Sequence, residues 1–127
     1  MEAGWAAGII DGEGCINLGW QSGGGVRYRV VVEMNHRDTV RELYRIMNVG
    51  SVRRTKRGTY RWTAAAKDAE TALNKVSHLL VTKWKQAELL LRLASLVSTR
   101  PLGVPTPPML RRRYAALIKR CHVLNAR

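Results

Sequence analysis

The stretch that decides the fold reads Trp5-Ala6-Ala7-Gly8-Ile9-Ile10-Asp11-Gly12-Glu13-Gly14. Its alanines and isoleucines favour a helix. Gly4, Gly8 and Gly12 recur every four residues, so they lie close to one face of that helix. Glycine costs a helix about 1 kcal/mol relative to alanine. Three glycines on one stripe therefore predict that another backbone packs closely against this face.

Two acidic side chains, Asp11 and Glu13, end the predicted helix. The helix macrodipole disfavours a negative charge there by roughly 0.3–1 kcal/mol per group, and a bound cation would relieve this cost. Mg²⁺ takes oxygen ligands and keeps several waters, so one carboxylate and one carbonyl from each of two chains can suffice beside substrate phosphates. Two copies of the helix that pack through their glycine faces would bring two Glu13 side chains together.

The charge of the chain predicts a polyanionic partner. The formal net charge is +13, and 16 of the 22 basic residues are arginine, whose planar fork suits phosphates and guanine edges. An anionic membrane is the rival partner. However, charged residues interrupt the most hydrophobic segment, residues 79–97, so it cannot span a bilayer. These interruptions are Lys83, Lys85, Glu88 and Arg92.

The length of 127 residues predicts one domain over residues 1–127, in which a proline-rich connection, residues 98–108, leads to a C-terminal helix. Two cysteines and three scattered histidines show no zinc-ligand spacing. No secretory signal is evident. We therefore expect an intracellular protein of the cytoplasm, nucleoid or an organelle rather than a secreted one.

Alternating apolar residues predict two hairpins. The first pairs residues 15–20 with Val26–Met34 across a glycine-rich turn, and the second pairs residues 51–55 with residues 60–64. Asp38 or Thr39, with Glu42, is expected to cap the helix between the hairpins, and a third helix is expected from Asp68. Thr82 is expected to cap a fourth helix, and Pro108 to open the last one. Prolines 101, 105, 107 and 108 predict an irregular connection before it.

This order predicts an α+β fold, αββαββα, with a four-stranded antiparallel sheet and helices packed on one face. Trp20 and Trp62 are expected in the core, whereas Cys15 is either on the open face or a small buried thiol. The open face of the sheet would bind DNA, since arginine reads guanine and asparagine reads adenine in the major groove. The predicted DNA-binding residues are Asn17, Gly19, Arg27, Arg29, Glu33, Arg53, Lys56, Arg57, Arg61 and Thr63.

Residues 6–14, AAGIIDGEG, resemble the motif of the LAGLIDADG homing endonucleases, and the element order is similar to the core of that family. The resemblance implies paired motif helices in which the last acidic residue, here Glu13, binds a divalent metal together with the carbonyl of Gly12. Glutamate replaces the more usual aspartate but keeps an oxygen ligand. Asp11 matches an earlier acidic position that is more often structural. The predicted dimer interface comprises Gly4, Ala7, Gly8 and Asp11.

Two further catalytic positions follow from the same resemblance. His36 matches a polar residue at the end of the second strand that positions the hydrolytic water. Lys83 matches a lysine that stabilises the transition state, and Lys85 is the reserve assignment. With one motif and no internal repeat, the chain resembles the homodimeric members of the family.

The resemblance implies a site-specific endonuclease that cuts double-stranded DNA at a near-palindromic site. The expected cofactor is Mg²⁺; Mn²⁺ is expected to substitute, and Ca²⁺ to bind without supporting cleavage. The alternative is a relative that does not cleave and binds intron RNA as a splicing cofactor, or DNA as a regulator. Glu13 and Lys83 favour the enzyme, because a binding protein needs neither side chain.

Overall fold

The computed structural model describes residues 1–100 and 103–126, and it confirms the predicted order of elements. The predictions that fall on Pro101 lie outside the described residues. The elements are α1 (Glu2–Glu13), β1 (Gly14–Trp20), β2 (Val26–Met34), α2 (Arg37–Met47), β3 (Ser51–Arg54), β4 (Tyr60–Ala65), α3 (Lys67–Val76), the short 3₁₀ helix η1 (Ser77–Leu79), α4 (Trp84–Ser98) and α5 (Pro108–Asn125).

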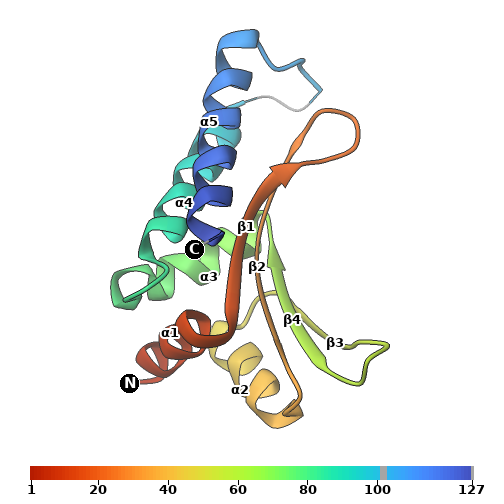
Figure 1. Ribbon diagram of the computed structural model, residues 1–127, viewed down its shortest axis with the longest axis vertical. Helices are drawn as coiled ribbons and strands as arrows, with labels where there is room; N and C mark the ends of the chain where they lie inside the picture. Colours follow the sequence, from red (N-terminus) through yellow and green to blue (C-terminus); the bar gives the residue numbers. More distant parts are fainter. Residues whose placement is uncertain (101–102, 127) are drawn as a thin grey trace.

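The four strands form one antiparallel sheet in the order β1-β2-β4-β3. In Figure 1 the helices lie on one side of this sheet, and the other side, here called the open sheet face, carries none. Successive residues of a strand point to opposite faces, so the register assigns each residue to a side. Asn17 lies opposite Arg29, and Gly19 lies opposite Arg27, which puts these four residues on the open sheet face.

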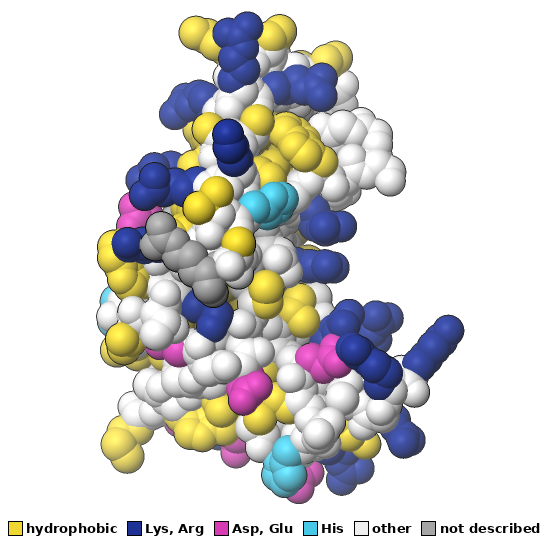
Figure 2. Space-filling view, in the orientation of Figure 1, with side chains coloured by type: hydrophobic (Ala, Val, Ile, Leu, Met, Phe, Trp, Pro, Cys, Tyr) yellow, Lys and Arg dark blue, Asp and Glu magenta, His cyan; other side chains and the backbone are white. Residues whose placement is uncertain are grey.

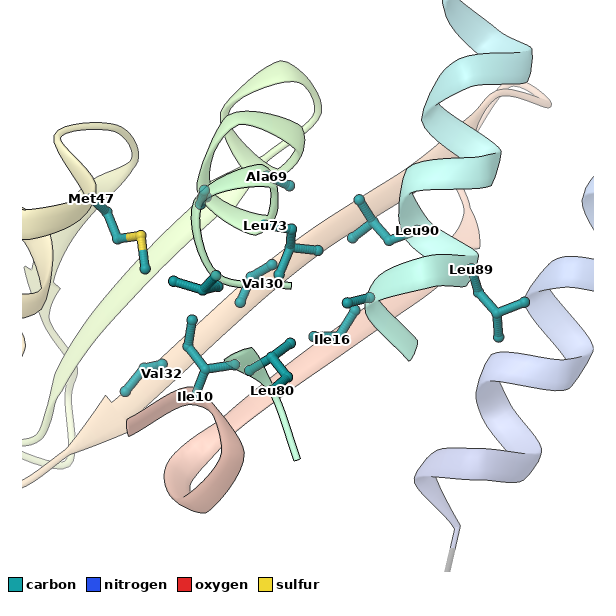
Figure 3. Close-up of a cluster of buried hydrophobic side chains, with 14 of the residues drawn as sticks. Ile10, Ile16, Val30, Val32, Met47, Ala69, Leu73, Leu80, Leu89 and Leu90 are labelled. Atoms are coloured by element: carbon teal, nitrogen blue, oxygen red, sulfur yellow. The ribbon is translucent and has the colours of Figure 1, made fainter. Parts of the chain in front are cut away.

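The core fills the space between the sheet and the helices. The apolar face of each amphipathic helix covers the apolar face of the sheet, which removes both from water. Figure 3 shows the side chains that meet there, from α1, α3 and α4 on one side and from the sheet on the other. Among the fully buried ones are Ile10, Leu73, Leu90, Ile16, Val30 and Val32, and Trp62 is buried as predicted.

Two helix N-termini differ from the sequence predictions. His36, rather than Asp38 or Thr39, is the N-cap of α2, because its ring Nδ1 accepts a hydrogen bond from the Thr39 amide at 3.3 Å. Lys83 is the N-cap of α4, and the side chain of Thr82 turns toward α1 instead of capping. At α4 the Thr82 hydroxyl donates to the Asp11 carboxylate, so no side chain caps the first amides of this helix.

The last helix begins at Pro108, as predicted, with proline in its first turn. Tyr114, Ile118 and Cys121 are buried along it. The prediction that Trp20 belongs to the core is wrong: Trp20 is 40% exposed, and the guanidinium of Arg111 lies 6.0 Å from the centre of its ring. None of the described helices combines the length and hydrophobicity of a bilayer-spanning segment.

Candidate functional site

The junction between α1 and β1 determines where Glu13 lies. Glu13 is the last residue of α1, and Gly14 both ends that helix and begins β1. A Cβ atom on Gly14 would lie 2.7 Å from the carbonyl oxygen of Ile10, too close for any other residue without a backbone shift. Glycine therefore lets the helix pass directly into the strand and leaves the exposed Glu13 at one end of the sheet.

Asp11 binds a segment that is about seventy residues away in sequence. Its carboxylate accepts hydrogen bonds from the amides of Val81 at 2.7 Å, Thr82 at 3.1 Å and Lys83 at 3.1 Å, and from the Thr82 hydroxyl at 3.0 Å. Partial burial alone would raise the pKa of Asp11. The hydrogen bonds outweigh it and hold the pKa of this carboxyl below its ordinary value.

Lys83 completes this contact from the other side. Its ammonium donates to the backbone carbonyl of Asp11 at 2.5 Å, so the lysine lies against the C-terminal turn of α1. Lys85, the reserve assignment, points elsewhere, with its Nζ 5.6 Å from the centre of the Trp84 ring. Of the two lysines, the geometry brings Lys83 to the acidic end of α1.

Glu13 shares a surface hollow with the end of β2. The hollow is lined by Glu13, Glu33, Met34, Asn35, His36 and Thr59, so the structure brings His36 and Glu13 to one place. The Nδ1 atom of His36 is already engaged, since it also lies 2.7 Å from the Thr39 hydroxyl. Only the Nε2 atom of this ring is left for a water or a substrate.

Glu33 organises the basic side chains beside this hollow. Its carboxylate accepts hydrogen bonds from Thr59 at 2.8 Å and from Arg61 at 2.8 Å, and it pairs with Arg57 at 2.8 Å. The hydrogen bonds from Thr59 and Arg61 hold the pKa of Glu33 below its ordinary value, against a smaller effect of burial. Glu33 of β2 therefore contacts Arg57 and Arg61 of the β3–β4 hairpin directly. The sequence did not indicate these ion pairs.

The open sheet face carries most of the predicted DNA-binding residues at its surface. Arg27, Arg53, Lys56 and Arg57 are exposed, and Asn17, Arg29, Glu33, Arg61 and Thr63 are partly exposed. Figure 2 shows Lys and Arg side chains projecting from the side of the molecule that has no helices in Figure 1. The register adds Cys15, Val31, Ser51 and Ala65 to this face, and Cys15 is exposed rather than buried.

The structure differs from the predicted DNA-binding surface at Gly19. This glycine is buried, because the guanidinium of Arg27 lies over it, 3.3 Å from where a Cβ would be. Gly19 therefore supports Arg27 rather than offering its own surface to DNA. On the same face, the Nε atom of Arg29 is buried without a hydrogen-bond partner among the described residues.

Of the four residues predicted at the dimer interface, two are exposed glycines and two are engaged within their own chain. Gly4, Gly8 and Gly12, here called the glycine stripe, are exposed, and a Cβ atom on any of them would meet nothing within 4 Å. Ala7, in contrast, is 1% exposed in the core of its own chain, so it is unavailable to a partner. The carboxylate of Asp11 is likewise committed to residues 81–83 of its own chain.

The oxygen donors near Glu13 suit a hard divalent cation. Residues 1–100 and 103–126 contain no group of three or more His, Cys, Asp and Glu side chains that could enclose a metal ion. The Glu13 carboxylate and the Gly12 carbonyl are adjacent in the chain, but they make an incomplete ligand set. They fit a cation that takes the rest of its oxygen ligands from outside these two residues.

Comparison with known proteins identifies the class of fold. No protein-family model matches the sequence, and no curated protein matches at a significant level. The solved structures that match include homing endonucleases, several of them with bound DNA. The chain therefore has the LAGLIDADG homing-endonuclease fold, as the resemblance of residues 6–14 predicts.

Among these structures is the homing endonuclease I-CvuI in complex with its target in the presence of calcium. It has a TM-score of 0.84 and 23% identity, with 97% of this chain and 81% of that chain covered. The homing endonuclease I-TnaI gives a TM-score of 0.63 at 17% identity, covering 95% of this chain and 98% of that chain. The archaeal intron-encoded homing endonuclease I-Vdi141I, complexed with DNA, gives a TM-score of 0.65 at 12% identity, covering 96% of this chain and 97% of that chain. At these identities the likeness establishes the fold alone.

Proposed function

We propose that this protein is a divalent-metal-dependent endonuclease that binds a near-palindromic double-stranded DNA site as a homodimer and cuts both strands. One observation carries the proposal: Glu13, next to the glycine stripe, lies at the end of an arginine-bearing sheet face, and Lys83 is held against the same helix end. The residues that we assign to DNA binding, dimer formation and hydrolysis thus lie close to the end of α1.

DNA would lie along the open sheet face. Arg27, Arg53, Arg57 and Arg61 supply the planar donors that bind phosphates and guanine edges, and Asn17 supplies the pattern that suits adenine. Because Glu33 pairs with Arg57 and Arg61, those two guanidinium groups reach the DNA in fixed orientations. The DNA-bound homing endonucleases of the same fold support this assignment.

Hydrolysis would take place at the end of α1. Glu13 and the Gly12 carbonyl would hold the metal, which supplies an activated water and neutralises charge on the phosphate. Lys83 would bring a positive charge to the same phosphate, where charge develops in the transition state. His36 would hold a water through its Nε2 atom, since its Nδ1 is occupied by Thr39.

A second copy of the chain would complete the site. The glycine stripe leaves room for the backbone of an identical helix, and Trp5 on the same helix is 40% exposed. Packing two copies along this stripe would bring two Glu13 side chains to one centre, between two sheets that together can follow a symmetric DNA site. This arrangement would also bury the helix surface that is bare in the single chain.

The substitution Glu13→Gln tests the metal assignment. It removes the negative charge with little change of shape, so we expect loss of cleavage by about 100-fold or more and unchanged affinity for DNA. Random near-palindromic DNA would be incubated with Mg²⁺, Mn²⁺, Ca²⁺ or EDTA, and the ends sequenced. Staggered ends at a symmetric site with Mg²⁺ or Mn²⁺, and none with Ca²⁺ or EDTA, are the expected result.

Glu88→Gln is the matched control, because it neutralises an exposed glutamate of α4 that pairs with Arg92. Equal cleavage by Glu13→Gln and Glu88→Gln would refute the role of Glu13. Tight binding of DNA or of structured RNA by a wild-type chain that never cuts would instead support the alternative, a regulator or splicing cofactor with the same fold.

A further inference from the structure

The end of α1 and the segment that leads into α4 are hydrogen-bonded to each other at the predicted active site. The carboxylate of Asp11, in the last turn of α1, accepts the amide hydrogens of Val81, Thr82 and Lys83, the three residues that precede α4. In return, the Lys83 ammonium donates to the Asp11 carbonyl at the end of α1. Each helix terminus thus receives a charge of the sign that its macrodipole favours.

We propose that Asp11 is a positioning residue that fixes Lys83 relative to Glu13, and this inference rests on the proposed endonuclease function. Asp11 lies two residues before Glu13 and binds the backbone of Lys83 itself. The Thr82 hydroxyl adds to this contact, since it donates to the Asp11 carboxylate at 3.0 Å and lies 3.4 Å from the Asp11 carbonyl oxygen. Asp11 therefore acts through Lys83, without touching substrate.

The hydrogen bonds between Asp11 and the backbone of residues 81–83 anchor Lys83. Lys83 precedes the first turn of α4, and a lysine side chain with four rotatable bonds holds no fixed place unless its backbone is anchored. Three amide hydrogen bonds to one carboxylate provide that anchor. A displacement of about 1 Å at a reacting group can cost a reaction about 100-fold, so loss of the anchor is expected to slow cleavage strongly.

The first test requires no cleavage. In Asp11→Asn the amide group cannot accept three backbone hydrogens as the carboxylate does. Hydrogen exchange in a peptide over residues 80–84 should accelerate about 10- to 100-fold, the range for hydrogen bonds to a charged group. Reductive methylation should rise at Lys83 relative to Lys85, whose ammonium lies over the Trp84 ring rather than on the Asp11 carbonyl. Exchange and methylation equal to those of Asp38→Asn, an exposed aspartate of α2, would overturn the proposal.

The second test is a double-mutant cycle on single-turnover cleavage with Asp11→Asn, Lys83→Met and the double variant. We expect Asp11→Asn to lower the rate about 100-fold with its Ca²⁺-supported DNA affinity unchanged. In the Lys83→Met background it should cause no further loss. If Asp11→Asn lowered the cleavage rate by another factor of about 100 in that background, Asp11 would act independently of Lys83, and the inference would be refuted.

The two tests separate this inference from the proposed function. If the wild-type chain cuts no DNA, the endonuclease proposal fails, and exchange and methylation still decide whether Asp11 holds Lys83. If the wild-type chain cuts DNA and Asp11→Asn leaves the rate, exchange and methylation unchanged, only the positioning role fails.

Discussion

Gly14 shows how a single hydrogen in place of a side chain determines the position of an acidic residue. The Ile10 carbonyl lies where the Cβ of any other residue would be, at 2.7 Å. A larger residue must push α1 away from β1, which moves Glu13 with it. The glycine at the end of the motif is thus required by the geometry of the helix-to-strand junction.

We expect Gly14→Ala to destabilise the fold by about 1–3 kcal/mol, the usual cost of forcing an extra carbon into a packed site. Urea denaturation would measure the change. Gly25→Ala is a suitable control, because a Cβ atom there meets nothing within 4 Å in the turn between β1 and β2. Equal stability of both variants would contradict the steric explanation.

Individual residues also mark the limit of what the sequence predicted. Alternation identified the face of each strand, and Trp62 is buried as expected. Trp20 also follows the pattern of a core residue, yet it is 40% exposed at the end of β1, beside Arg111 of α5. The contacts of Asp11 with residues 81–83 span about seventy residues, so no local pattern could reveal them.

At the scale of elements, α5 closes the free edge of β1. The Asn125 side chain donates to the Ile16 carbonyl at 2.9 Å, and His122 Nε2 lies 2.9 Å from the Leu18 carbonyl. Both carbonyls belong to a strand with a neighbour on one side only. The sequence predicted the start of α5 from Pro108, but not this role, because the polar residues involved follow no hydrophobic period.

Replacement of Asn125 by Ala should destabilise the protein by about 1–2 kcal/mol, since it leaves the Ile16 carbonyl with only a weak Cys121 thiol donor at 3.4 Å. Hydrogen exchange should show β1 opening more often than β4. Asn74→Ala, an exposed position of α3, is the control and should change stability by less than about 0.5 kcal/mol. A similar loss in both variants would count against edge closure.

For the whole molecule, the glycine stripe should affect the stability of the single chain and the stability of the proposed dimer in opposite directions. Gly8 is exposed in a helix, and a methyl group there meets nothing in its own chain. Gly8→Ala should therefore stabilise the isolated chain by up to about 1 kcal/mol through helix propensity. The same methyl group should hold two α1 helices apart and weaken the homodimer.

Sedimentation equilibrium and thermal unfolding at low concentration would measure the two effects of Gly8→Ala. Ser95→Ala, at an exposed position of α4, should also favour its helix slightly but leave the assembly unchanged. An unweakened dimer in Gly8→Ala would show that the chains associate through some other surface.

The strand order has a consequence for solubility. A sheet with two free edges can recruit strands from other molecules and aggregate. Here α5 occupies the edge at β1, and the opposite edge is β3, which is four residues long and carries Arg53 and Arg54. A short strand with two positive charges repels its own copies. The sheet of the proposed DNA-binding face thus has one edge covered by α5 and the other protected by its short length and positive charge.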